Sequence, residues 1–324
     1  MKRILLILLA AVMTLSLFSC AKPKEPAPAL SVGFLKGPTG VGAAYLMDQN
    51  EKGACEGNYA FTLEEDPSAV TAAFIQGSLS AAAVPTNVAA VLYNKMEGNV
   101  RIVAVNTLSV LHILEAGDTV HSVADLRGRT VYATGQGANP EYVLNYILRE
   151  NGLEPGTDVT VEFMDSGELA TRMVSGELDL CMLPIPAATT VLMKNKDVRD
   201  ALSLGDEWAK TSAGSELAQG CIVVRADLDD LDARMAAFLK DYGASIAFMS
   251  DGKNLEEAAE LTVKYGIIPS AEIAKAALPD CGLTFLSGHD AVKGCMDGYL
   301  QVMFDADPAS VGGKLPDEDF YYKA

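Results

Sequence analysis

The stretch VTAAFIQGSLSAAAVPTNVAAVLYNK, residues 70–95, recurs in altered form as LATRMVSGELDLCMLPIPAATTVLMK, residues 169–194. The two segments align without a gap at an offset of 99 residues. The identical residues that stay in register include Gly77 with Gly176, Leu79 with Leu178, Pro85 with Pro184, and Lys95 with Lys194. An alignment of this length without gaps indicates an internal duplication.

Both copies predict the same local structure. In each, an amphipathic helix ends at a glycine, as helices often do. A run of small apolar residues follows, at 79–84 in the first copy and 178–183 in the second, and is typical of a buried strand. A proline then opens a turn into a second helix. The duplicated segment is therefore expected to be an α-β-α module.

A related unit precedes each copy. A strand at 31–35 leads through KGPTG into a helix at 41–50, and a strand at 129–133 leads through TGQGANP into a helix at 140–151. Strands that alternate with helices of this length favour a parallel sheet covered by helices on both faces. We predict an α/β fold of two doubly wound lobes, with mostly parallel sheets, joined by a hinge.

The order of the remaining elements predicts the lobe boundaries. A strand at 101–105 is assigned to the first lobe and a strand at 111–115 to the second, with residues 106–109 as the crossing. A further strand is predicted at 220–225. Helices with a 3.6-residue period follow at 231–249, 255–265, 271–278 and 291–304. We predict a first lobe of residues 30–108 and 226–324, and a second lobe of residues 109–225.

The N-terminus indicates secretion. Lys2 and Arg3 precede an almost unbroken apolar run at 4–15, which is the pattern of a signal peptide. Leu17-Phe18-Ser19-Cys20 resembles the lipobox of bacterial lipoproteins, in which the cysteine is lipidated and becomes the first mature residue. Ordinary cleavage with Cys20 as a bystander is the alternative. We predict a lipoprotein signal peptide at 1–19, a flexible tether at 20–29, and an extracytoplasmic protein anchored to the cell membrane through lipid on Cys20.

Charge and length narrow the functional class. The 324 residues include 25 basic and 43 acidic side chains, a net charge of −18, and removal of Lys2 and Arg3 makes it −20. Such a surface repels nucleic acid, and the sequence has no basic cluster, so no nucleic-acid partner is expected. No apolar run after the signal peptide reaches the ~18 residues of a membrane helix. The mature chain is long enough for two lobes.

The cysteines do not predict a metal site. Five remain after Cys20, and they form neither a C-x-x-C pair nor a Cys/His cluster with zinc spacing. Cys281 and Cys295 are the nearest pair in the sequence. An oxidising exterior would permit a disulfide between them, and free thiols are the alternative. We expect no metal and no cofactor.

Loops at the carboxyl ends of the strands are the expected ligand site, because open parallel sheets bind ligands there. KGPTG follows such a strand but matches neither a Walker A loop nor G-x-G-x-x-G. Glycines permit close backbone approach, and Thr, Asn and Gln add neutral hydrogen-bonding groups. The predicted ligand-binding residues are Lys36, Gly37, Pro38, Thr39, Thr86, Asn87, Asn106, Thr107, Gly135, Gln136, Gly137, Pro184 and Ile185. Two hinged lobes lined in this way could close on a small molecule.

Several segments spread over nearly the whole mature chain carry a family resemblance. They are GFLKGPTGVGA, AAVPTNVAAVLYNK, AVNTL, SVADLRGRTVYATGQGANPEYVLNYIL, GCIVVR and SVGGKLPDEDFYY. Together they resemble the solute-binding lipoproteins of ABC importers, of the type II periplasmic-binding fold, and most closely the group related to sulfonate-, nitrate- and thiamine-precursor-binding proteins. The resemblance implies a monomer that delivers a small polar solute to an ABC permease. Such proteins often carry a glutamate between the two prolines, where this chain has Ile185.

Two other functional classes share this architecture. A sensory or receptor lipoprotein would use the same closure with a different partner. An enzyme would need a nucleophile with an oriented base, or paired carboxylates in the cleft. The histidines are His112, His121 and His289, none is obviously paired with a Ser or Cys, and there is no G-x-S-x-G elbow. We expect a binding protein and no catalysis. Lys36 is the sole basic residue in the assigned loops, so we expect a neutral or weakly anionic solute.

Overall fold

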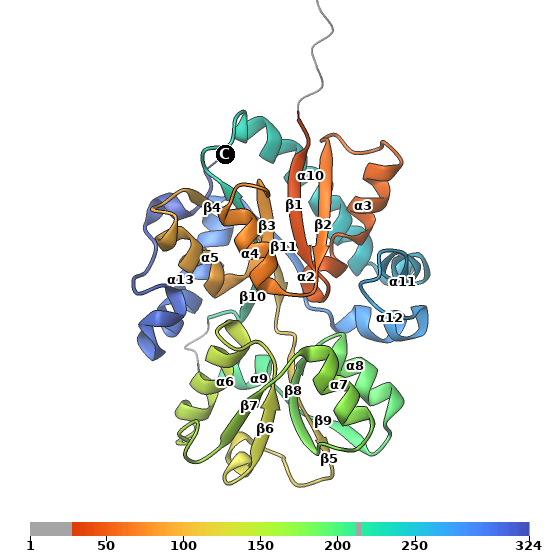
Figure 1. Cartoon of the computed structure of the whole chain (residues 1–324), viewed down its shortest axis with the longest axis vertical. Helices are drawn as coiled ribbons and strands as arrows, with labels where there is room; N and C mark the ends of the chain where they lie inside the picture. Colours follow the sequence, from red (N-terminus) through yellow and green to blue (C-terminus); the bar gives the residue numbers. More distant parts are fainter. Residues whose placement is uncertain (1–27, 212–214, 324) are drawn as a thin grey trace, which may run out of the picture.

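A computed structural model describes residues 28–211 and 215–323 of the chain (Figure 1). Within these residues the strands form two sheets, one in the order β11-β4-β10-β3-β1-β2 and the other in the order β7-β6-β8-β5-β9. Each sheet belongs to a separate lobe, and helices cover both lobes from outside (Figure 1). The predicted two-lobe α/β fold is confirmed. The predicted signal peptide and most of the tether lie outside the described residues.

The first lobe is built around the larger sheet. Its strands are β1 (Leu30–Leu35), β2 (Tyr59–Glu64), β3 (Ala81–Pro85), β4 (Val100–Leu108), β10 (Ala218–Arg225) and β11 (Leu283–Ser287). Its helices are α2 (Pro38–Val41), α3 (Ala44–Glu51), α4 (Pro67–Ile75), α5 (Thr86–Lys95), α10 (Leu231–Ser250), α11 (Leu255–Lys264), α12 (Ala271–Ala277) and α13 (His289–Ala306).

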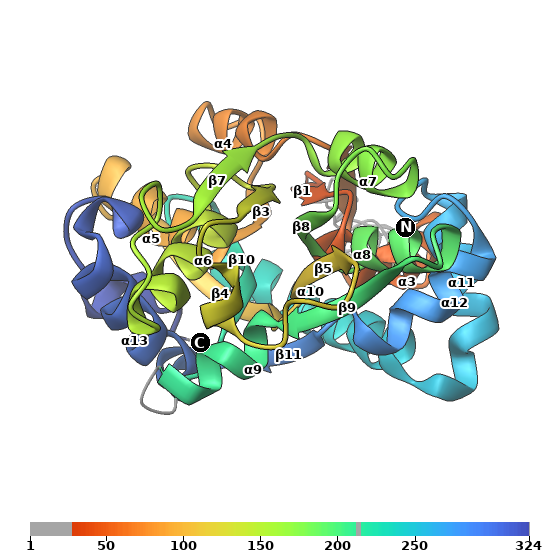
Figure 2. The same ribbon diagram turned by 90° about the horizontal axis from the view of Figure 1, so that it is seen from below.

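The second lobe is smaller and continuous in sequence. Its strands are β5 (Leu111–Ala116), β6 (Thr130–Ala133), β7 (Thr160–Phe163), β8 (Leu180–Pro184) and β9 (Val198–Ser203). Its helices are α6 (Asn139–Glu150), α7 (Ser166–Val174), α8 (Ala187–Lys194) and α9 (Leu204–Thr211). In Figure 2, which views the molecule from below, the strands of this lobe lie in front of those of the first.

The duplication is visible in the coordinates. A shift of 99 residues carries α4 onto α7 and β3 onto β8, with both ends of each element in register. The order β2-β1-β3 in the first sheet corresponds to β7-β6-β8 in the second, and in each sheet the next strand is one that comes directly after a crossing between the lobes. That strand is β10 in the first lobe and β5 in the second, and each pairs antiparallel with its neighbours.

The structure corrects one lobe boundary. The strand predicted at 220–225 was assigned to the second lobe, but β10 lies in the first sheet between β3 and β4. Its residues are buried along nearly their whole length, so the apolar pattern marks a central strand without saying which sheet contains it. The chain therefore returns to the first lobe before Ala218. The later helices also reach the second lobe, since α12 contacts α8 and α13 contacts α6.

Two crossings join the lobes and run beside each other. The first leads from β4 to β5, and the second leads from α9 to β10. Ser109 N donates to Leu217 O at 3.1 Å, and Val110 N donates to the Gln219 side-chain oxygen. These bonds tie one crossing to the other and define the hinge.

The described cysteines are free thiols, so no bridge joins Cys281 to Cys295. Both side chains are buried, and burial raises the pKa of the Cys281 thiol to about 12 and that of Cys295 to about 11. Of the two alternatives left open by the sequence, the structure has the free thiols. Among the described helices, none is both long and apolar enough to cross a membrane.

Candidate functional site: an interlobe cleft

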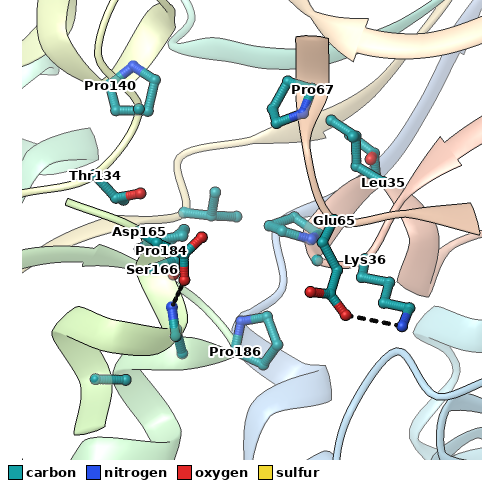
Figure 3. A pocket seen from close by; sticks show the side chains of 18 of the residues that line it. Leu35, Lys36, Glu65, Pro67, Thr134, Pro140, Asp165, Ser166, Pro184 and Pro186 are labelled. Carbon is teal, nitrogen blue, oxygen red and sulfur yellow. Dashed lines mark hydrogen bonds and ion pairs between the residues drawn. The ribbon is translucent and has the colours of Figure 1, made fainter. Parts of the chain in front are cut away.

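A cavity of about 890 Å³ lies between the lobes and is lined by loops of both. Leu35 and Pro85 reach it from the carboxyl ends of β1 and β3 in the first lobe. Thr134 and Pro184 reach it from the corresponding ends of β6 and β8 in the second (Figure 3). The strand-end rule thus places the loops of the two lobes around one space.

Eight of the thirteen predicted ligand-binding residues line this cavity. They are Lys36, Gly37, Pro38, Thr39, Thr107, Gly135, Gln136 and Pro184. They come from the loops after β1, β6 and β8 and from the end of β4. Whether these residues contact a ligand stays a prediction.

The structure places the other five predicted residues away from the cavity lining. Thr86 and Asn87 form the first turn of α5 with their side chains buried. Asn106 is buried inside the first lobe and Ile185 inside the second. Gly137 lies in an exposed turn, where its N–H donates to the Glu141 carboxylate at 2.6 Å. These residues share the loops with lining residues but do not face the space.

Their buried polar groups hold the loops in place. Asn87 Nδ2 donates to Ser310 O at 3.0 Å, and Asn106 Nδ2 donates to the Tyr242 hydroxyl at 2.8 Å. Unpaired buried amides would each cost about 1–3 kcal/mol, so such bonds are a structural requirement. The side-chain amides from which a ligand contact was predicted instead form hydrogen bonds within the first lobe.

Sequence reasoning missed two lining segments, one in each lobe. They follow β2 and β7, which were not predicted, and Asp66 and Asp165 occupy equivalent places in them. Asp66 Oδ1 accepts from Ser68 N at 2.8 Å and caps α4. Asp165 Oδ1 accepts from Gly167 N at 2.8 Å and caps α7. An aspartate just before a helix is a capping signal that the sequence did contain.

The charged side chains of the lining lie at its rim. Lys36 Nζ pairs with Glu65 Oε1 at 3.0 Å, with side-chain exposures of 35% and 78% (Figure 3). Asp66, Asp165 and Lys194 are also exposed. Hydrogen bonds from the side chain and backbone of Ser68 lower the pKa of Asp66. The rim therefore carries opposite charges that are partly neutralised and open to solvent.

The most buried polar side chains of the lining are uncharged. Thr39, Thr107, Asn139 and Gln219 all line the cavity, and none is more than 9% exposed. We call these four residues the floor. Two buried atoms of the floor, Thr39 Oγ1 and Asn139 Oδ1, have no hydrogen-bond partner among the residues that the structure describes.

Asn139 also connects the two lobes at the hinge. Its Nδ2 donates to Ala218 O at 3.0 Å and to Thr86 Oγ1 at 3.1 Å. Thr86 Oγ1 in turn donates to Ala218 O at 2.5 Å. A carbonyl oxygen only accepts, so the Asn139–Ala218 bond fixes the amide with Nδ2 toward Ala218.

The histidines considered for catalysis are elsewhere. His112 Nδ1 lies 2.9 Å from Asp200 Oδ2, and His289 lies between Asp290 and Glu318. Neither these two nor His121 lines the cavity. Within residues 28–211 and 215–323, no group of His, Cys, Asp and Glu side chains could hold a metal ion.

Comparison with known proteins locates the fold among transport proteins. No protein-family model matches the chain, and no curated protein matches it in sequence. An ABC transporter structure from Parabacteroides distasonis is similar, with a TM-score of 0.75, 20% identity, and coverage of 91% of this chain and 99% of that one. The periplasmic aliphatic sulphonate binding protein SsuA from Escherichia coli matches with a TM-score of 0.70, 17% identity, and coverage of 92% and 94%.

A third solved structure is similar over less of its length. The periplasmic nitrate-binding protein NrtA from Synechocystis matches with a TM-score of 0.59, 17% identity, and coverage of 77% of this chain and 69% of that one. At these identities the likeness shows the fold. The chain therefore has the periplasmic-binding fold that its sequence predicted.

Proposed function

We propose that this protein is the extracytoplasmic solute-binding component of an ABC importer, which captures a small polar molecule and delivers it to a membrane permease. The observation that carries the proposal is the cavity of about 890 Å³ with walls from both lobes. Small-molecule sites typically have ~300–1,000 Å³. The similar structures, which are transport and binding proteins, support the same function.

The geometry suggests how binding is coupled to transport. A molecule that contacts both sets of loops stabilises the state in which the lobes are close, because only that state provides both contacts. The paired crossings at the hinge allow the lobes to move as bodies. Closure changes the outer surface around the cleft, and the permease would recognise this changed surface. Release needs only reopening, so no covalent chemistry is involved.

We further propose that Cys20 is lipidated and holds the protein at the outer face of the cell membrane, as a monomer. The lipobox resemblance supports this proposal. Replacing the cysteine, Cys20→Ala, should release the protein from the membrane fraction, whereas Cys55→Ala should leave it there. Retention of the Cys20→Ala protein in the membrane fraction would contradict the lipid anchor.

Calorimetric titration tests the solute-binding function. The chain without its first 20 residues is titrated with sulfonates, nitrate, pyrimidines, polyols and aliphatic amides. The proposal expects one saturable site per molecule for at least one compound, recovered unchanged afterwards. No saturable binding across the panel would contradict the function, and chemical conversion of a bound compound would show an enzyme instead.

A further inference from the structure

The cavity continues beyond the strand-end loops, along two helices of the second lobe. We call its lining there the α7–α8 face, which consists of Ala170, Thr171 and Val174 of α7, and Ala187, Thr190 and Lys194 of α8. Along each helix these residues recur at intervals of three and four, so they lie on one side of it. The face extends over about 10 Å, which is the rise of α8 from Ala187 to Lys194.

The duplicated counterpart of α8 in the first lobe is packed against protein at the same place. Under the shift of 99 residues, Thr190 of α8 corresponds to Val91 of α5. Lys194 corresponds to Lys95 in the same way. Gly312 lies so close to α5 that an added Cβ would come within 3.1 Å of the Val91 Cα. Neither Val91 nor Lys95 lines the interlobe cavity, so only the copy in the second lobe is open to a solute.

The two copies also differ in the groups that they offer to whatever lies on them. Asn87 and Asn94 of α5 donate side-chain hydrogen bonds to the backbone carbonyls of residues 310 and 311, at 3.0 and 2.9 Å. The corresponding residues of the second lobe are Pro186 and Met193, whose side chains cannot donate. The first-lobe helix therefore holds a stretch of polypeptide, whereas the α7–α8 face suits a hydrocarbon chain.

Lys194 is the charged side chain of the lining whose charge the protein does not compensate. Lys36 pairs with Glu65 at 3.0 Å. Asp66 and Asp165 each accept a hydrogen bond from a backbone N–H at the start of a helix. Among the described residues, none forms an ion pair or a hydrogen bond with the Lys194 ammonium. A solute that lies along α8 therefore meets one unpaired positive charge at the end of the face.

The number of donors near this charge limits the kind of anion. Thr171 Oγ1 donates to Gly167 O at 2.8 Å, and Thr190 Oγ1 donates to Pro186 O at 3.2 Å. A hydroxyl has one proton, so both can only accept from a solute, and Lys194 is the donor side chain of the face. Within the described part of the chain, the lining includes no arginine fork for the three oxygens of a sulfonate or phosphate. One carboxylate, with two oxygens, matches this single donor.

We infer, on the basis of the proposed function, that the solute is an elongated aliphatic carboxylate whose hydrocarbon chain lies on the α7–α8 face and whose carboxylate pairs with Lys194. The methyl groups of Ala170, Val174 and Ala187 contact the chain, and Ile267 adds an apolar side chain from the first lobe to the same cavity. Lys194 is exposed, so the carboxylate keeps part of its hydration and avoids the cost of a buried charge.

The first test compares matched straight-chain compounds by calorimetry. The probes are butyrate, hexanoate and octanoate, the sulfonates and alcohols of the same chain lengths, and nitrate and urea, which have no chain. One saturable site for the carboxylates is expected, with affinity rising about two- to fourfold per added methylene. If another class binds as tightly as the carboxylates or more tightly, or co-purifies, the solute class is overturned while the solute-binding function stands. If no compound binds and none co-purifies by native mass spectrometry, the function itself fails, and this inference fails with it.

The second test uses the duplication as its control. Lys194→Met removes the charge and keeps an unbranched apolar chain, and Lys95→Met makes the same change in net charge at the corresponding place in the first lobe. Both lysines are exposed, so neither variant should change the melting temperature. Affinity for octanoate should fall roughly 2- to 5-fold in the Lys194→Met protein and stay unchanged in the Lys95→Met protein. No loss in the first variant, or an equal loss in both, would overturn the pairing with Lys194.

The third test asks where the hydrocarbon chain lies. Thr171→Trp places a large ring on the α7–α8 face, and Ala72→Trp places the same ring at the corresponding position of α4, which does not line the cavity. Both positions are exposed, so both variants should fold. The Thr171→Trp protein should lose the gain in affinity from butyrate to octanoate, whereas the Ala72→Trp protein should keep it. If both variants keep the gain, or both lose it, the chain does not lie on this face.

Discussion

The duplicated segments of the two lobes are alike in their helices and strands and differ in the loops that face the cleft. α4 and α7 coincide at both ends under the 99-residue shift, as do β3 and β8. After the third strand, however, α5 begins at once at Thr86, whereas α8 begins at Ala187, after the cis Ile185–Pro186 bond. The first lobe has buried polar residues at this point and the second has apolar ones. The duplicated scaffold is thus present twice, and the loops that line the cavity differ between its two copies.

Substitutions at equivalent core residues test whether the two copies of the scaffold contribute similarly to the free energy of unfolding. Phe74 and Met173 occupy the same place in α4 and α7, and both are fully buried. Phe74→Ala should lower the free energy of unfolding by about 3–5 kcal/mol and Met173→Ala by about 2–5 kcal/mol. Urea denaturation followed by circular dichroism measures both, with Val263→Ala, at an exposed position, as the control.

Both core variants should unfold in one transition. Clusters of buried residues extend across the lobes, and α12 and α13 pack against helices of the second lobe. A separate early transition in the Met173→Ala protein alone would show that the second lobe unfolds independently. It would contradict the expectation that both lobes unfold together.

Acid should destabilise the second lobe through the buried carboxylate of Glu115. The Glu115 side chain is 1% exposed, and burial opposes its ionisation. Hydrogen bonds from Thr119 and Val120, and the charge of Arg199, outweigh burial and lower the pKa of Glu115 to about 2. A lowered folded-state pKa contributes stability that is present above the unfolded value near 4.5 and is lost as the pH falls toward 2.

The effect of this carboxylate is on the order of 3 kcal/mol, from about 1.4 kcal/mol per pKa unit. Urea denaturation at pH 7, 5, 3.5 and 2.5 should therefore show the wild-type protein losing its advantage over Glu115→Gln as the pH falls. Glu150→Gln, at an exposed position on α6, is the control. A difference between wild type and Glu115→Gln that does not change with pH would contradict the lowered pKa.

The smallest expected effects come from the paired helix caps. Asp66→Ala and Asp165→Ala each remove a side-chain acceptor at the first turn of a helix, and each should cost about 1 kcal/mol. Asn substitutions, which keep an acceptor, should recover most of the loss. Melting temperatures of the four variants measure this, and a loss at only one of the two sites would mean that the lobes no longer use the same cap.

The sequence predicted the scaffold because buried strands and amphipathic helices leave a repeated apolar pattern. It missed β2 and β7, in which exposed residues alternate with less exposed ones, so neither has a long apolar run. Asp66 and Asp165 were lost with them, because they lie in the loops that follow these strands. The buried run of β10 predicted a strand, but its sheet depends on pairing with β3 and β4, more than a hundred residues earlier.

Thr39 and Thr107 of the floor were predicted, but Asn139 and Gln219 were not, for a related reason. Asn139 looks like a turn residue in TGQGANP, and its importance comes from Ala218 and Thr86, which are distant in sequence. Thr86 and Asn87 have the residue types of a ligand loop but turn into the first lobe because α5 begins there. Side-chain chemistry indicated candidates, and only the path of the chain decides which of them face the cleft.

A crystal structure of the complex with the tightest compound of the solute panel tests the central claim most directly. The loops of the two lobes are expected to hold one molecule between them, with residues of both lobes in contact with it and the lobes drawn together. Density for the compound on the outside of a single lobe, or in the cleft against one rim only, would contradict the account.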